Sequence, residues 1–173
     1  MKKLLIVIDM QNDFIDGALG TPEALAIVPA VAEKLRAYPP EAVIATMDTH
    51  GPDYLNTREG RFLPVEHCIR GTEGWLLRAE LLPLLRGASI YEKPAFGCLR
   101  LAQDLAKLPD LEEAELVGLC TDICVVSNAL LLKAALPELD IRVDAACCAG
   151  VTPERHRAAL DTMRSCQIEV YGD

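Results

Sequence analysis

Cys124 stands where an apolar run of the sequence gives way to an amphipathic one. We predict a strand over Glu113–Leu119 and a helix over Asp122–Ala135, which places this thiol at the first turn of the helix. There it faces unpaired N–H groups and the positive end of the helix dipole, and both favour a thiolate. The sequence therefore predicts a nucleophilic cysteine of low pKa. The backbone N–H groups of Cys120 and Cys124 could hold the oxyanion that forms when the thiolate attacks a carbonyl.

Charged residues end three further apolar runs of the sequence. Asp9, Asp48 and Lys93 each close a stretch that we predict to be a strand, the first of them buried on both faces. Any one of them alone could be a solvated strand end. In an open parallel sheet, however, ligands bind outside the carboxyl ends of the strands. Because these three residues and Cys124 follow four successive strands, we expect them to converge on one site.

The residue types at these strand ends suit attack on an amide carbonyl. Asp9 is the candidate base that takes the thiol proton from Cys124, and Lys93 would stabilise both anions by its charge. The protonated Asp9 could then give its proton to the departing amine, and a water activated by the same carboxylate would cleave the thioester. This chemistry requires no histidine.

A long polar stretch after the second predicted strand carries a separate signal. Asp48 and His50 are two residues apart and so lie on one side of an extended segment, and Glu59 and His67 follow. Two oxygen and two nitrogen ligands suit a divalent ion, with zinc first and manganese or iron as alternatives. Glu59 could instead be a solvated loop carboxylate. His156, on a polar helix face, is interpreted as an ordinary surface residue.

Short apolar runs alternate with longer amphipathic stretches along the chain, which predicts a parallel sheet with helices on both faces. We expect an α/β fold of one domain over residues 1–173, a doubly wound three-layer α/β/α arrangement around a six-stranded parallel sheet. The predicted strands are Lys3–Asp9, Glu41–Asp48, Ala88–Lys93, Glu113–Leu119, Asp140–Ala146 and Gln167–Tyr171. The predicted helices are Pro22–Arg36, Trp75–Leu85, Arg100–Lys107, Asp122–Ala135 and a helix capped by Thr152 that ends near Ser165.

Composition restricts the class of partner. The 173 residues carry a formal net charge of −9, which argues against nucleic acid or an anionic membrane surface as the partner. We find no run long enough to cross a bilayer and no secretory signal before the first strand. The seven cysteines include no CxxC pair and two adjacent residues, a poor framework for disulfides. We therefore expect reduced thiols and a cytoplasmic protein.

Five segments carry recognisable motifs in one order along the chain. They are Leu5–Phe14, Asp48–His50, Leu63–Thr72, Glu92–Phe96 and Gly118–Val125. Together they resemble the opening, metal-loop, lysine and cysteine motifs of the isochorismatase-like cysteine hydrolases, whose members include nicotinamidases and pyrazinamidases. The resemblance implies the Rossmann-like fold of that superfamily.

By position, the resemblance makes Asp9, Lys93 and Cys124 a catalytic triad. It also implies a cis peptide bond without proline at Leu119–Cys120, which would direct the amides of Cys120 and Cys124 toward the oxyanion. The implied metal ligands are Asp48, His50 and His67, with Glu59 as the fourth. In nicotinamidases the metal binds the pyridine nitrogen of the substrate and orients it, while the triad activates the nucleophile.

The resemblance implies a small amide as substrate, nicotinamide first among them, and Phe14 and Phe96 are the candidate ring-stacking walls. Leu63 and Pro64 stand where an aromatic residue often lines the pocket of these relatives, and Tyr54 replaces a histidine that some of them have. These departures leave the acyl group of the substrate open.

Three alternatives remain at this point. The first is an amidase of the same superfamily acting on N-carbamoyl or ureido groups, which the metal-loop residues disfavour because such enzymes need no metal. The second is a metallohydrolase in which metal-bound water attacks directly. The third, a binding module without catalysis, is disfavoured because every triad position is intact. The oligomeric state is either a monomer or a homo-oligomer.

Overall fold

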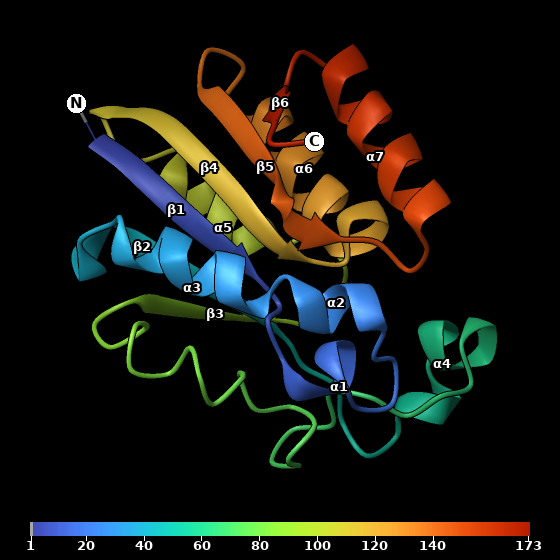
Figure 1. The fold of residues 1–173 in the computed structure, drawn as a ribbon. Helices are drawn as coiled ribbons and strands as arrows, with labels where there is room; N and C mark the ends of the chain where they lie inside the picture. Colours follow the sequence, from blue (N-terminus) through green and yellow to red (C-terminus); the bar gives the residue numbers. More distant parts are fainter. Residues whose placement is uncertain (1) are drawn as a thin grey trace.

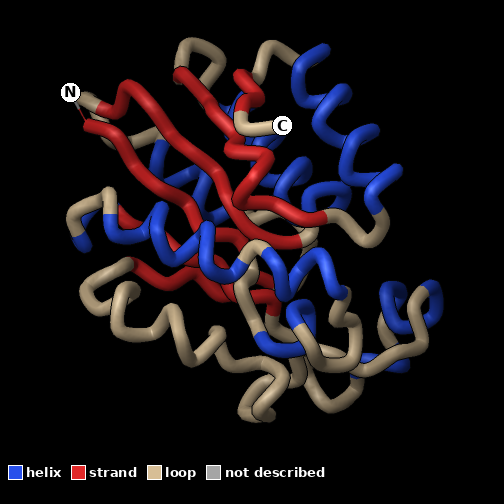
Figure 2. The backbone as a smooth tube through the Cα atoms, in the orientation of Figure 1, coloured by secondary structure: helices blue, strands red, loops and turns tan. Residues whose placement is uncertain are grey.

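The protein, described here from a computed structural model covering residues 2–173, is built on one six-stranded parallel sheet (Figures 1 and 2). The order of strands across the sheet is β3-β2-β1-β4-β5-β6, so the chain reverses its direction of winding between β1 and β4. The strands are β1 (Lys2–Ile8), β2 (Val43–Asp48), β3 (Ser89–Lys93), β4 (Leu111–Leu119), β5 (Asp140–Ala149) and β6 (Glu169–Tyr171). This is the doubly wound α/β fold that the sequence predicts.

Helices cover both faces of the sheet, with α2 and α3 on one face and α5 and α6 on the other (Figure 1). The α-helices are α1 (Asn12–Ile15), α2 (Pro22–Ala26), α3 (Val28–Arg36), α4 (Arg58–Phe62), α5 (Leu99–Leu105), α6 (Val126–Ala135) and α7 (Pro153–Ser165). A π-helical turn over Thr121–Val125 precedes α6, and 3-10 turns cover Pro40–Ala42 and Tyr54–Asn56.

The central strand β1 shows why both faces are covered. Ile6 and Ile8 belong to the core under α5 and α6, whereas Leu5 and Val7 belong to the core under α2 and α3. Because successive side chains of a strand point to opposite faces, an uninterrupted apolar run fits only a sheet that is buried on both sides.

The single helix predicted over Pro22–Arg36 is two helices, α2 and α3, which separate at Ile27. Pro29 has no N–H to donate to the carbonyl of Leu25, and its ring crowds that carbonyl, so a continuous helix cannot form there. The predicted N-cap is confirmed, since the Thr21 side chain accepts a hydrogen bond from the Ala24 N–H.

The helix predicted over Trp75–Leu85 is wrong. This segment runs as turns after a short extended stretch in which Leu77 forms an antiparallel bridge with Gln11. The Arg78 N–H donates to the Met10 carbonyl at 2.8 Å, so the chain that follows β1 takes the backbone groups that a helix would use. Leu77 is nevertheless buried in the core, and burial of its apolar side chains explains the apolar periodicity of this segment.

The polar stretch after β2 contains one helix that the sequence did not predict, α4. Its N-terminus is capped by Thr57, whose Oγ1 accepts a hydrogen bond from the Gly60 N–H at 3.0 Å. Phe62, at its end, is 77% exposed. A short helix without a buried apolar face leaves little periodicity to recognise.

Within residues 2–173, no helix has the length and apolar character needed to span a bilayer. All seven cysteines carry free thiols in the structure.

Replacing Gly118 with alanine is expected to lower the free energy of unfolding by about 3–5 kcal/mol, because both space and backbone conformation at this position require glycine. Gly118 lies near the end of β4 with φ of 118°, and a Cβ there would lie 2.1 Å from the Ile8 carbonyl oxygen. Urea unfolding followed by circular dichroism measures the change.

Gly71→Ala is the matched control for this substitution. Gly71 has φ of 85°, but a Cβ there would meet no atom within 4 Å. The Gly71→Ala substitution should therefore lower the free energy of unfolding by only about 1 kcal/mol, the energy needed to hold alanine in the left-handed conformation. Equal losses in the two variants would show that the close approach of β1 and β4 is not what restricts Gly118.

Candidate active site

The carboxyl ends of four neighbouring strands bring the predicted polar residues together. Asp48 and Lys93 end β2 and β3 and are direct partners in the register of those strands. Asp9 immediately follows β1, and Cys124 lies in the turn that follows β4. The site therefore lies at one edge of the sheet and includes the switch point between β1 and β4, where doubly wound folds bind ligands.

Lys93 lies between the other two residues of the predicted triad. Its Nζ is 2.7 Å from Asp9 Oδ2 and 3.5 Å from Cys124 Sγ. All three side chains are buried, with Asp9 fully inaccessible to solvent. Burial disfavours the ammonium, but the charges of Asp9 and Asp48 raise the pKa of Lys93, so it remains a cation.

Asp9 is a fully buried carboxylate with a raised pKa. Burial is the largest influence on the pKa of Asp9 and raises it, against the lowering effect of Lys93. Thr46 Oγ1 donates to Asp9 Oδ1 at 2.6 Å, and Oδ2 is ion-paired with Lys93 Nζ at 2.7 Å. Both oxygens are thus held in place, and the raised pKa makes the carboxylate a better proton acceptor than an exposed aspartate.

The predicted low pKa of Cys124 is wrong for the resting protein. Burial raises the pKa of Cys124 well above its ordinary value, the Asp9 charge raises it further, and Lys93 opposes them only in part. The thiol lies in the fourth position of the turn and is only 4% exposed, so desolvation exceeds the helix dipole. The protonated thiol is therefore the favoured form of Cys124 in this structure.

The turn that carries Cys124 begins at a cis peptide bond between Leu119 and Cys120, as the resemblance implied. The helix predicted from Asp122 starts with π-helical hydrogen bonds before α6 continues it. Asn128, on α6, secures this turn because its Nδ2 donates to the Cys124 carbonyl at 2.8 Å.

Asp48, His50, Glu59 and His67 form a cluster whose ligand atoms all lie within 4.8 Å of one another. Asp48 Oδ2 is 3.0 Å from His50 Nε2 and 3.6 Å from His67 Nε2. Glu59 Oε1 is 3.6 Å from His50 Nε2 and 3.7 Å from His67 Nε2. The structure therefore brings together all four residues that the sequence predicts as metal ligands, Glu59 included.

These four side chains supply two oxygen and two nitrogen ligands, a set that suits a divalent ion, and a fifth position would remain open to the substrate. Ligands about 2.0–2.1 Å from zinc lie about 3–4 Å apart, and the four distances between carboxylate oxygens and ring nitrogens are 3.0, 3.6, 3.6 and 3.7 Å. The Val65 carbonyl lies 2.8 Å from His67 Nδ1, which fixes the hydrogen on Nδ1 and leaves Nε2 as the ligand atom. Hydrogen bonds from His50 and His67 hold the pKa of Asp48 below its ordinary value despite burial. The cluster concentrates negative charge that a cation would neutralise.

A small cavity of about 40 Å³ joins the thiol to the metal cluster. Phe14 and Phe96, the predicted ring-stacking residues, both line it, Phe14 buried and Phe96 46% exposed. The other lining residues are Leu19, Asp48, Glu59, Leu63, His67, Cys120, Ile123 and Cys124.

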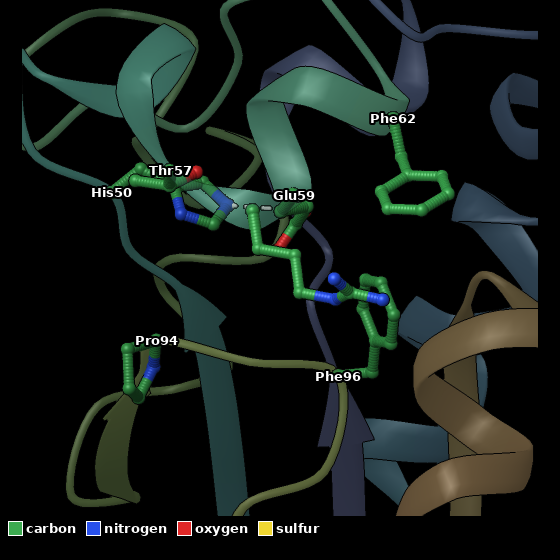
Figure 3. A pocket seen from close by; sticks show the side chains of 7 residues that line it. His50, Thr57, Glu59, Phe62, Pro94 and Phe96 are labelled. Carbon is green, nitrogen blue, oxygen red and sulfur yellow. Dashed lines mark ion pairs between the residues drawn. The ribbon is translucent and has the colours of Figure 1, made fainter.

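A larger cavity of about 590 Å³ lies outside the small one and shares Glu59 and Phe96 with it. In Figure 3, His50 and Glu59 meet at one wall of this outer cavity, and Phe62 extends from α4. Glu59 and Phe96 therefore form part of the wall of both cavities.

The model of the isochorismatase domain matches residues 3–172 of this sequence. The chain belongs to the isochorismatase family. Among solved structures, the pyrazinamidase of Pyrococcus horikoshii in complex with zinc is similar, with a TM-score of 0.82, 27% identity and 100% coverage of both chains. The nicotinamidase/pyrazinamidase of Bacillus subtilis has a TM-score of 0.81 and 31% identity, covering 98% of this chain and 99% of that one. The nicotinamidase/pyrazinamidase of Mycobacterium tuberculosis is 29% identical over 187 aligned positions, 97% of each protein.

Sequence reasoning missed three residues that support this isochorismatase-family site: Gln11, Thr46 and Asn128. Gln11 bonds both backbone groups of Asp48, donating to its carbonyl at 2.8 Å and accepting from its N–H at 2.7 Å. Each is a buried polar side chain. For Thr46 and Asn128, a polar residue within an otherwise apolar strand or helix was the signal available, since buried polar groups need partners.

Proposed function

We propose that this protein hydrolyses the C–N bond of a small aromatic carboxamide such as nicotinamide, yielding the carboxylic acid and ammonia. The observation that carries the proposal is the buried cluster of Asp9, Lys93 and Cys124 beside a cavity that the metal cluster also lines. Membership of the isochorismatase family and similarity to nicotinamidases support an amide as the substrate.

Acylation begins when Asp9 takes the thiol proton and Cys124 sulfur attacks the amide carbon. A C–S bond forms, the carbonyl oxygen becomes an oxyanion, and the backbone N–H groups of Cys120 and Cys124 stabilise it. The oxyanion collapses, the C–N bond breaks, and the proton held by Asp9 passes to nitrogen, so that ammonia leaves. Lys93 keeps its charge throughout and stabilises the anion that forms on either neighbour.

Deacylation reverses the roles of the same residues. Asp9, again a carboxylate, takes a proton from a water molecule that attacks the thioester carbon. The C–S bond then breaks, the carboxylic acid forms, and the proton returns to the Cys124 sulfur. Each turnover consumes one water, and both residues return to their initial protonation states.

Asp48, His50, Glu59 and His67 would hold the divalent ion, with zinc as the proposed identity. When bound, the ion supplies a Lewis-acid position to which a ring nitrogen of the substrate can bind. Phe14 and Phe96 line the cavity on the path between this cluster and Cys124, where their rings can stack on an aromatic acyl group.

Ammonia release from a set of matched amides tests the proposal. Nicotinamide and pyrazinamide should be hydrolysed, whereas benzamide, which has the same shape without a ring nitrogen, should show kcat/KM lower by about 10²-fold. The protein is assayed after loading with zinc and again after chelation.

Two results would contradict the proposal in different ways. Hydrolysis of N-carbamoylglycine without hydrolysis of nicotinamide would point to the carbamoyl amidases of the same family. Equal rates for benzamide and nicotinamide would show that no ring nitrogen is recognised, and the metal cluster would then have another role.

A further inference from the structure

The connection between β5 and α7, together with the first turn of α7, contacts the turn over Thr121–Val125 at two points. His156 Nδ1 lies 2.8 Å from Thr121 Oγ1, and the Val151 N–H donates to Asp122 Oδ1 at 2.9 Å. Thr121 and Asp122 are the first two residues of the turn that contains Cys124. Figure 1 shows α7 beside α6, and α7 packs directly against the turn. Neither contact has a part in the chemistry proposed above.

His156 is not the ordinary surface residue that the sequence suggested. Its side chain is half-buried in the first turns of α7, and Thr121 is fully buried. Burial is the largest influence on the pKa of His156 and lowers it, so the ring is neutral near pH 7. A neutral imidazole and a hydroxyl form one directed hydrogen bond, whichever of them donates.

The backbone between β5 and α7 packs closely against this turn. A Cβ at Gly150 would lie 2.8 Å from the backbone nitrogen of His156 and 2.9 Å from Asp122 Oδ1. The chain can therefore pass between β5 and α7 only with a glycine at this point. The two contacts and this close approach restrain the turn in addition to the Asn128 bond.

We propose that His156 is a positioning residue: through Thr121 it holds the turn so that the amides of Cys120 and Cys124 face the reacting carbonyl. This role rests on the proposed function, because it concerns the geometry of the same attack. A displacement of about 1 Å in such a group can cost about 10²-fold in rate. Loss of the hydrogen bond should therefore lower kcat and leave KM nearly unchanged.

The test compares two substitutions of His156 in zinc-loaded, full-length protein with nicotinamide as substrate. In His156→Leu the hydrogen bond is lost, and kcat should fall about tenfold with KM within about twofold. In His156→Asn the amide atoms lie one bond from Cγ, as Nδ1 does, so kcat should stay within about threefold of the unmodified protein. A parallel fall in both variants, or an increase of KM alone, would overturn the proposal.

Substitutions of Thr121, which shares the hydrogen bond with His156, distinguish loss of that bond from loss of folding. Thr121→Val should reproduce the low kcat, and Thr121→Ser should restore it. The double variant His156→Leu/Thr121→Val should be no slower than either single variant, because both remove the same bond. Losses that multiply would show that each residue acts separately and would overturn the proposal. Arg157→Leu, at an exposed position of α7, is the matched control and should retain full activity.

Alkylation of Cys124 by iodoacetamide separates this proposal from the proposed function. If the unmodified protein does not hydrolyse nicotinamide, the proposed function fails. Slower alkylation of Cys124 in His156→Leu, but not in His156→Asn, would still support the positioning role. Equal alkylation in all variants, together with equal kcat, would show that the contact only packs α7 against the sheet.

Discussion

Cys124→Ala is expected to abolish ammonia release from nicotinamide, with a loss of about 10⁴-fold or more in kcat. Two cysteines, Cys120 and Cys124, line the small cavity, and Cys124 is the one whose sulfur lies 3.5 Å from Lys93 Nζ, the partner of Asp9. Continuous assay of ammonia measures the loss. Mass spectrometry of acid-quenched unmodified protein should detect the acyl thioester on the peptide that contains Cys124, and the variant should lack it.

Cys166→Ala is the matched control because Cys166 also carries a free thiol but lies outside the site, at the end of α7. Its activity should equal that of the unmodified protein. If Cys124→Ala keeps substantial turnover that a chelator abolishes, the metallohydrolase alternative would replace the proposed mechanism, since metal-bound water would then be the nucleophile.

His67→Ala is expected to release the divalent ion and to lower kcat/KM for nicotinamide by about 10²-fold or more. His67 Nε2 faces both carboxylates of the metal cluster, so its loss removes one of four ligands. Elemental analysis should find about one zinc per chain in the reconstituted protein and substantially less in the variant. Cys124 should remain open to alkylation by iodoacetamide, because the triad is built on other elements.

Glu66→Ala is the matched control, since it removes an exposed carboxylate next to His67 that does not belong to the cluster. Its metal content and activity should not change. Failure of the unmodified protein to take up zinc, manganese or iron after reconstitution would defeat the metal assignment and favour the carbamoyl amidase alternative.

Much of the site could be predicted because parallel sheets follow a simple rule. Asp9, Asp48 and Lys93 each end a segment with the pattern of a strand, and the carboxyl ends of parallel strands share one edge. The local pattern therefore indicated which residues converge. The family motifs predicted the cis peptide bond at Leu119–Cys120, which the structure contains.

Other features depend on contacts between distant parts of the chain. The extended conformation near Leu77 arises from pairing with Gln11, which overrides the helical periodicity of that segment. Glu59, on α4, reaches the histidines only through the path of the polar stretch after β2, and no local pattern specifies that path.

The protonation state of Cys124 likewise depends partly on the local sequence and partly on the tertiary structure. The sequence by itself determined that this thiol follows a strand and begins a helix beside a lysine and an aspartate. Only the tertiary structure decided that it is buried with Asp9, so that its pKa is raised and not lowered. The contact between His156 and Thr121 likewise joins residues 35 positions apart. Desolvation and such contacts are properties of the packed chain, because they depend on what every neighbouring element brings to the same place.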